Sequence, residues 1–233
     1  MLHIIRHGHS FVEIETEKGS ILIDPFITDN PKCDVTVEDM IAKNIIAICL
    51  THGHEDHVGN ALDIARAKQV PIVCEYGMAK WIRVVQRWEN VIVGSVGGKI
   101  VVDDDLMVTF CLAIHGGNIM DAVGYQTIAC GLLLDCHGKK IYHAGDTALT
   151  MDMQLLANKH IDVACLPIGD TYTMGVEDAA IAATWIKPTI VFPIHFDTRP
   201  KIRVDAVDFA RRVMAAGPTV PKVLTPGQYV VLE

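Results

Sequence analysis

Long apolar runs are missing from this chain of 233 residues, although half of its residues are hydrophobic. A membrane-spanning helix needs about 18 or more consecutive apolar residues, and no run in this sequence approaches that length. Residues 1–6 also lack the apolar stretch of a secretory signal peptide. These absences argue against a membrane protein, and we expect a cytoplasmic location.

Positive charge is scarce as well. The chain has 20 Lys and Arg against 28 Asp and Glu, which gives a formal net charge of −8. Proteins that grip nucleic acid neutralise phosphates with Lys and Arg, so the charge balance argues against a nucleic-acid partner. With 50% hydrophobic and 21% charged residues, the chain is also too apolar to be intrinsically disordered.

Three further chemical signatures are absent. The seven cysteines are odd in number, never spaced Cys-x-x-Cys, and several lie inside apolar runs, so we interpret them as buried thiols of a reducing compartment. No Gly-x-Ser-x-Gly sequence offers a serine nucleophile. Neither glycine-rich nucleotide motif is present in its full form.

Apolar periodicity predicts strands mixed with helices in both halves of the chain. The predicted helices lie at residues 37–43, 58–65, 78–87, 151–158, 176–186 and 206–215. The predicted strands lie at residues 2–6, 11–15, 20–24, 45–50, 71–74, 99–102, 106–113, 131–135, 140–143, 163–167, 189–194 and 229–232. The middle region, residues 91–142, is expected to be mostly strand. This rhythm predicts an α/β protein with two sheets, each covered by helices on its outer face. No linker interrupts it, so residues 1–233 are predicted to form a single domain.

Histidine is the unusual component of the composition, with 11 residues in the chain. The densest cluster is Thr51-His52-Gly53-His54-Glu55-Asp56-His57, between a predicted buried strand and a helix. In an extended segment, His52 and His54 leave from the same side, and Asp56 and His57 follow where the helix begins. Three imidazoles and a carboxylate suit zinc or a similar divalent ion. The alternative is a solvated His/Asp helix cap.

More candidate ligands lie at the ends of apolar strands. His115 follows the predicted strand 106–113, Asp146 follows 140–143, and His195 follows 189–194. Each of these alone fits an ordinary strand-end residue. Together with the first cluster, they complete two three-ligand metal sites that share one carboxylate.

These residues, in this order and context, resemble the metallo-β-lactamase fold superfamily of metal-dependent hydrolases over essentially the whole chain. Shorter motifs resemble a small bacterial and archaeal family of metal-dependent hydrolases related to the ascorbate-phosphate lactonase. They are Gly8-His9-Ser10, Asp24-Pro25, Gly145-Asp146-Thr147, Thr173-Met174-Gly175, Glu177-Asp178-Ala179 and Pro193-x-His195. Val176 stands where relatives are expected to carry proline.

The resemblance implies a four-layer αββα sandwich with a metal pair at one edge. It assigns the first ion to His52, His54 and His115, the second ion to Asp56, His57 and His195, and the bridge between them to Asp146. Two divalent ions about 3.5–4 Å apart lower the pKa of a shared water and polarise the substrate. The expected cofactors are two divalent ions, with zinc first and manganese, iron or nickel as alternatives.

Four residues are candidates for roles beyond simple ligation. Asp56 is expected to act in catalysis as well as in binding the metal. His9 is expected to be a pocket residue or an outer-shell partner of a ligand. Tyr172, in a predicted rim loop, is a candidate hydrogen-bond donor to substrate, with an ordinary connecting loop as the alternative. Asp24 either orients a ligand histidine or simply ends a strand before Pro25.

The function predicted from the sequence is a metal-dependent hydrolase. It would use hydroxide bound to two metals to open a small ester, lactone, amide or phosphoester. The alternatives are an iron-bearing redox protein of the same fold and a non-catalytic metal-binding module. A small molecule is the expected substrate, no membrane partner is expected, and self-association into a homo-oligomer stays open.

Overall fold

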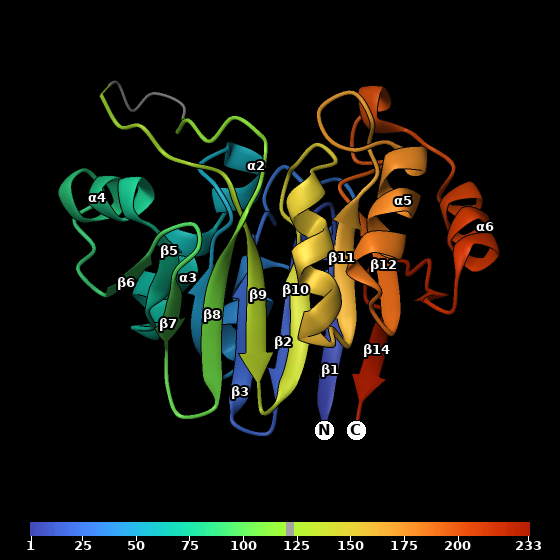
Figure 1. Ribbon diagram of the computed structural model, residues 1–233. Coiled ribbons are helices and arrows are strands. Elements are labelled where there is room, and N and C mark those ends of the chain that lie inside the picture. Colours follow the sequence, from blue (N-terminus) through green and yellow to red (C-terminus); the bar gives the residue numbers. More distant parts are fainter. Residues whose placement is uncertain (120–123) are drawn as a thin grey trace. The chain divides into compact units, whose positions relative to one another are not determined.

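A computed structural model describes residues 1–119 and 124–233 of the chain (Figure 1). The chain divides into two compact units. The first comprises Met1–Ser95, Gly116–Ile128 and Thr225–Glu233, and the second comprises Val96–His115 and Ala129–Leu224. Each unit contains one seven-stranded sheet, in line with the two sheets predicted from the sequence. That all 233 residues form a single domain stays a prediction.

The sheet of the first unit is mixed, with strand order β14-β1-β2-β3-β4-β5-β6. Its first four strands pair antiparallel, and β3, β4, β5 and β6 pair in parallel. The apolar run of the β4 region gives a strand that is buried along nearly its whole length. The strands are β1 (Leu2–Gly8), β2 (Phe11–Thr16), β3 (Gly19–Ile23), β4 (Ile45–Cys49), β5 (Ile72–Glu75), β6 (Val91–Gly94) and β14 (Tyr229–Leu232).

The helices of the first unit are α1 (Val37–Ala42), α2 (Glu55–Val58), α3 (Ala61–Lys68) and α4 (Tyr76–Val84). Thr36 caps α1, because its side chain accepts a hydrogen bond from the Asp39 N–H and the Asp39 carboxylate accepts one from the Thr36 N–H. The helix predicted at 58–65 is instead two short helices, because the chain leaves the helical conformation at Gly59 (φ 42°). Apolar side chains of α1, α3 and α4 pack on one face of the sheet and form its core.

The sheet of the second unit is also mixed, with strand order β13-β12-β11-β10-β9-β8-β7. Both β8 and β10 pair antiparallel with β9, and β10, β11, β12 and β13 pair in parallel. The carboxyl ends of β8, β10, β11 and β12 therefore share one edge. The strands are β7 (Lys99–Val101), β8 (Leu106–Leu112), β9 (Cys130–Cys136), β10 (Lys139–His143), β11 (Val163–Pro167), β12 (Ile190–Ile194) and β13 (Val220–Pro221).

The helices of the second unit are η1 (Met151–Lys159), α5 (Val176–Ile186), η2 (Pro200–Ile202) and α6 (Ala206–Ala216). The three longer helices, η1, α5 and α6, share an apolar core with one face of the sheet. Figure 1 shows α5 and α6 neighbouring one another. The segment predicted as a helix at 151–158 is a 3₁₀ helix rather than an α-helix. Its preceding residue, Thr150, caps it by accepting a hydrogen bond from the Asp152 N–H.

Other differences from the sequence prediction are local. The middle region was expected to be mostly strand, but residues 113–119 and 124–129 form almost no regular structure between β8 and β9. Within the described part of the chain, no helix combines the length and the apolar character of a membrane span. All seven cysteines are free thiols, and burial raises the pKa of Cys111 and Cys136 to about 11. Five of the seven are buried, as interpreted from the sequence, whereas Cys33 and Cys111 are only partly buried.

A buried ionic network ties the first strands of the first unit together. The Glu13 carboxylate is fully buried and accepts hydrogen bonds from His7 Nε2 (2.8 Å), Ser20 Oγ (2.5 Å) and Lys43 Nζ (2.6 and 2.8 Å). Burial acts to raise the pKa of Glu13, but the hydrogen bonds from His7, Lys43 and Ser20 outweigh it and lower the pKa to about 2. Burial acts to lower the pKa of His7, but its bonds to Asp34 and Glu13 raise it above 6.5.

This network predicts a loss of stability in acid. The folded-state pKa of Glu13 (about 2) lies below its ordinary value of 4.5, so its contribution is present above pH 4.5 and is lost as the pH falls toward 2. We expect Glu13→Gln to lower the free energy of unfolding at pH 7 by about 3 kcal/mol and to flatten its decline between pH 4.5 and 2. Urea denaturation at several pH values measures both effects.

Glu15→Gln is the matched control for this prediction. Glu15 lies on the same strand but is partly exposed, and it bonds the partly exposed His3. Its substitution should change the free energy of unfolding by less than about 1 kcal/mol. An unfolding free energy of Glu13→Gln that declines in acid as steeply as that of the wild type would contradict the assignment.

Candidate metal centre

The histidine-rich segment of the first unit begins where two parallel strands end side by side. Asp24 directly follows β3, and Thr51 lies two residues beyond the end of β4. The buried Asp24 carboxylate accepts hydrogen bonds from the Thr51 N–H (2.9 Å) and from the Thr51 hydroxyl (2.6 Å). These bonds anchor the start of the segment to the neighbouring strand, at the sheet edge where ligands commonly bind.

Asp24 also orients His57. The Nδ1 atom of His57 lies 2.7 Å from Asp24 Oδ2, and both side chains are fully buried. Because a carboxylate only accepts, Nδ1 carries the proton, and the lone pair of the ring stands on Nε2. A carboxylate that holds a histidine in this way is the usual outer-shell partner of a metal ligand. Of the two roles predicted for Asp24, the structure therefore favours the orienting one.

Thr51 orients His52 in a similar manner. The Thr51 hydroxyl donates its hydrogen to Asp24, so its oxygen accepts from His52 Nδ1 at 3.0 Å. The lone pair of His52 is thereby placed on Nε2, which lies 2.9 Å from His54 Nδ1. Two nitrogens that bind one zinc ion at about 2.0–2.1 Å in tetrahedral geometry are roughly 3.3 Å apart. The spacing of His52 and His54 is therefore close to that of two ligands of one ion.

Gly53 separates these two histidines and permits a close approach of another segment. A Cβ atom at residue 53 would lie 2.5 Å from Ile119 Cγ1 and 2.7 Å from the Gly117 carbonyl oxygen. Any side chain would therefore push the histidine-rich segment away from residues 117–119.

His9 lies beside the same segment. Its ring is fully buried in a residue with φ of 50°, and its Nε2 lies 3.2 Å from Asp56 Oδ2. Ligand atoms of His9, Asp56 and His57 all lie within 4.8 Å of one another. A non-glycine residue held in the left-handed region is unusual and concentrates at functional sites. We call His9, His52, His54, Asp56 and His57 the first ligand cluster.

The second unit brings its three predicted ligands together at one sheet edge. His115, Asp146 and His195 follow β8, β10 and β12, whose carboxyl ends share that edge. Asp146 Oδ2 lies 3.0 Å from His195 Nε2 and 3.6 Å from His115 Nε2. Asp146 and His195 are both buried, with 3% of each side chain exposed. We call these three residues the second ligand cluster.

Close packing against Gly169 sets the position of His195. His195 follows β12 directly and has φ of 52°. A Cβ atom at residue 169 would lie 2.3 Å from the His195 carbonyl oxygen and 3.3 Å from its Nδ1. Only glycine leaves room for the histidine at this point, although the sequence alone gave no reason to single out Gly169.

The donor atoms of both clusters suit a divalent transition metal. They are imidazole nitrogens and carboxylate oxygens, which zinc, manganese, iron and nickel all accept. In the first cluster, outer-shell bonds from Asp24 and Thr51 leave the Nε2 lone pairs of His57 and His52 on the sides of the rings away from those partners. The residues therefore fit the metal that the resemblance implies.

Tyr172 and the remaining histidines belong to neither ligand cluster. Tyr172 belongs to a loop between β11 and α5 and is 51% exposed. His143 ends β10 and is buried, with its Nδ1 accepting from the Gly145 N–H at 3.1 Å. His7 belongs to the Glu13 network rather than to the first ligand cluster. His3, His137 and His160 are at least partly exposed.

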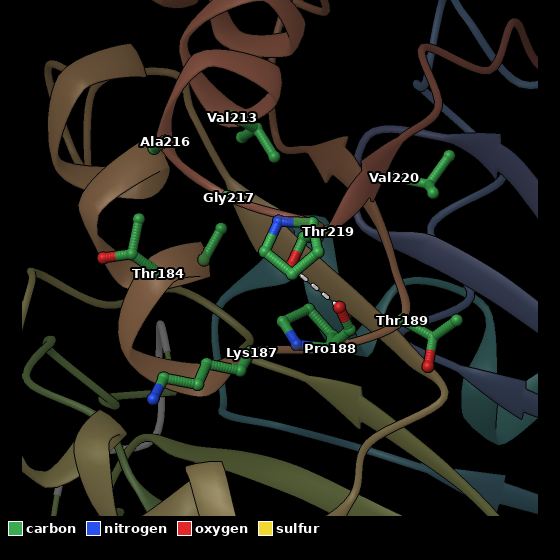
Figure 2. Close-up of a pocket in the computed structure, with 11 residues that line it drawn as sticks. Thr184, Lys187, Pro188, Thr189, Val213, Ala216, Gly217, Thr219 and Val220 are labelled. Carbon is green, nitrogen blue, oxygen red and sulfur yellow. Dashed lines mark hydrogen bonds between the residues drawn. The ribbon is translucent and has the colours of Figure 1, made fainter.

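Figure 2 shows a cavity of the second unit whose lining differs from the two ligand clusters. It has a volume of about 410 Å³ and lies where α5 and α6 end. Its lining is mostly apolar, with Lys187 as the charged side chain among the residues drawn, and the Thr219 hydroxyl donates to the Pro188 carbonyl oxygen at 2.8 Å. This lining offers no imidazole or carboxylate that could hold a metal ion.

Comparison with known proteins gives consistent results. A family described as the beta-lactamase superfamily domain matches residues 20–196. A UPF0173 metal-dependent hydrolase of Anoxybacillus flavithermus is 40% identical over 232 residues, which cover 97% of this chain and 98% of that protein. A metallo hydrolase of the archaeon Ignicoccus hospitalis, Igni18, is 33% identical, with a TM-score of 0.89 over 100% of this chain and 98% of that one.

A more distant structure, the diiron β-hydroxylase CmlA of Streptomyces venezuelae, has a TM-score of 0.73 at 15% identity and matches 99% of this chain and 54% of that one. That likeness shows a shared fold alone. Together with the two helix-flanked mixed sheets, these comparisons confirm the predicted α/β class and the metallo-β-lactamase fold.

Proposed function

The chain belongs to the UPF0173 family of metal-dependent hydrolases within the beta-lactamase superfamily, and from this premise we propose that it hydrolyses a small ester, lactone, amide or phosphoester at a pair of divalent ions. Hydrolysis that depends on metal is the shared property of its relatives. The bond that is cleaved, the number of ions and their identity are the proposal.

The observation that carries the proposal is the orientation of the ligands inside each cluster. In the first cluster, Asp24 and Thr51 set the tautomers of His57 and His52. In the second cluster, one carboxylate oxygen of Asp146 lies near the Nε2 atoms of two histidines. We propose that the clusters together bind two ions, one with His52, His54 and His115 and one with Asp56, His57 and His195, with Asp146 shared between them.

When bound, such ions act as Lewis acids that polarise the scissile group and make water nucleophilic near neutral pH. Side chains of the protein would accept the proton from water and bind the substrate. Asp56, whose Oδ2 accepts a hydrogen bond from His9 at 3.2 Å, would hold the proton that water loses. Tyr172, exposed on its loop, would donate a hydrogen bond to the substrate. Neither role requires a serine or cysteine nucleophile.

We propose zinc as the resident metal, with manganese, iron or nickel as the alternatives that the same ligands accept. We also propose a cytoplasmic location and a small-molecule substrate. The seven free thiols support a reducing compartment.

Metal content tests the proposal directly. Protein saturated with zinc and then freed of excess metal should retain close to two equivalents per chain by elemental analysis. The same preparation should hydrolyse at least one member of a panel of lactones, thioesters and phosphodiesters, and a chelator should abolish that activity. Saturation at one equivalent would refute the dinuclear site.

The choice of metal needs its own measurement. An iron-bearing redox protein of the same fold would contain iron as isolated and would show a visible absorption spectrum that changes on reduction. A non-catalytic module would bind metal but fail the whole panel. Such an iron spectrum with no hydrolysis of any panel member, or metal binding with no hydrolysis, would replace the hydrolase proposed here.

A further inference from the structure

His115 lies beyond the part of its strand that the sheet holds. The pairing of β8 with β9 ends at Leu112 and Cys130, so the ladder stops three residues before His115. The next strand of the chain, β9, begins only at Cys130. Residues 113–115 lie outside this ladder, yet the His115 Nε2 atom lies 3.6 Å from Asp146 Oδ2. Something other than the sheet must hold it there.

Thr147 supplies this constraint from the neighbouring ligand segment. Its hydroxyl oxygen accepts a hydrogen bond from the Ile114 N–H at 3.0 Å, while the hydroxyl donates to the Ala148 carbonyl oxygen at 2.8 Å. The Ala148 N–H in turn donates to the Ile114 carbonyl oxygen at 3.1 Å. The residue before His115 is thus fastened at both its N–H and its carbonyl to the two residues after Asp146.

The same threonine is anchored on its other side. Its side chain is fully buried, and its carbonyl oxygen accepts a hydrogen bond from the Met174 N–H at 2.9 Å. Met174 is buried in the core of the second unit. Thr147 therefore connects the segment that carries His115 to the buried core of the unit, with Asp146 as its immediate neighbour.

We infer that the Thr147 hydroxyl is a positioning group for metal binding, which holds His115 and Asp146 at a fixed separation. The inference rests on the proposed function, because it requires His115 and Asp146 to be ligands. Thr147 itself contributes no ligand atom. Its effect on the metal passes through the Ile114 backbone, and removal of the hydroxyl should loosen His115 and leave the rest of the unit folded.

The test compares three variants of the full-length chain. Thr147→Val keeps the size of the side chain and removes the hydroxyl, and Thr147→Ser keeps the hydroxyl. Thr219→Val is the matched control, because the Thr219 hydroxyl is also buried and donates to a backbone carbonyl, that of Pro188, at 2.8 Å. Thr147→Ala also removes the hydroxyl and serves if the valine variant yields no folded protein.

Two measurements are made on each variant. Amide hydrogen exchange at Ile114 should be about 5-fold faster in Thr147→Val than in the wild type, as expected for the loss of one hydrogen bond. Zinc affinity, measured by competition with a chromogenic chelator, should fall by about 10–100-fold, as expected for the loss of a group that orients a ligand. Thr147→Ser and Thr219→Val should match the wild type in both.

Zinc affinity in Thr147→Val equal to that of the wild type would overturn the inference, and so would an equal loss in Thr219→Val. In either case the wild type still binds zinc and the proposed function stands. A wild-type chain that binds no divalent ion would instead refute the proposed function, and the inference would fall with it.

Discussion

Asp146→Asn should remove most of the bound divalent metal and lower turnover by well over 100-fold, while the fold is retained. Loss of an outer-shell partner of a ligand typically costs about 10–100-fold in affinity or activity. Loss of the shared ligand itself should cost more. Among the substitutions in the second ligand cluster, this one is expected to have the largest effect.

The reason is the position of the Asp146 carboxylate. Its Oδ2 atom lies 3.0 Å from His195 Nε2 and 3.6 Å from His115 Nε2, and the side chain is buried. Asparagine has nearly the same shape but no negative charge, and one of its two polar ends donates hydrogen bonds. The two cations proposed here would need that charge, because burial leaves little solvent to screen their repulsion.

Elemental analysis and turnover, measured at matched folding by circular dichroism, test this expectation. Asp162→Asn is the control, since the Asp162 carboxylate accepts a hydrogen bond from the Lys140 N–H at 2.8 Å and lies in neither ligand cluster. Full metal content and full rate in Asp146→Asn would show that the ligand assignment is wrong at its central residue.

Much of the fold could be predicted from the sequence because its elements are locally well defined. The predicted bounds of 163–167, 176–186 and 229–232 coincide with β11, α5 and β14. Uninterrupted apolar runs predict buried strands, and the residue after such a run lies at a sheet edge. The same logic placed His115, Asp146 and His195 at strand ends, and these side chains do lie close together in the second unit.

The groups that orient the ligands could not be predicted in this way. Thr51 reaches Asp24 across 27 positions of the chain, and Thr147 reaches Ile114 across 33. A threonine beside a histidine or an aspartate carries no local signal of such a bond. The close approaches at Gly53 and Gly169 are likewise tertiary, because the atoms that exclude a Cβ come from other segments. Periodicity reports which face of an element is buried, and it says nothing about these contacts.

Asp24→Asn should be the most damaging substitution outside the ligands, because it is expected to change the tautomers of two histidines together. Asp24 Oδ1 accepts from the Thr51 N–H, and Oδ2 accepts from the Thr51 hydroxyl and from His57 Nδ1. A backbone N–H is a fixed donor, so the amide oxygen of asparagine should stay opposite it. The amide nitrogen then faces two groups that currently donate.

Both groups must become acceptors to avoid a buried donor–donor contact. His57 can accept only through an unprotonated Nδ1, which moves its proton to Nε2. The Thr51 hydroxyl, which now accepts from the asparagine, must direct its hydrogen toward His52 Nδ1 at 3.0 Å, and His52 is then also protonated at Nε2. Each of these ligands loses the lone pair that it would offer to a metal ion.

We therefore expect Asp24→Asn to lower zinc affinity by about 100-fold or more, at the upper end of the range for outer-shell partners, with a nitrogen NMR spectrum that shows His52 and His57 as Nε2–H tautomers. Asp34→Asn is the matched control, because Asp34 also accepts from a histidine Nδ1, that of His7, at 2.9 Å, and His7 is not in the ligand clusters. Its zinc content should equal that of the wild type. If Asp24→Asn retains wild-type zinc affinity with both tautomers unchanged, Asp24 acts only as a strand-end residue, and the orientation of His52 and His57 must come from the metal itself.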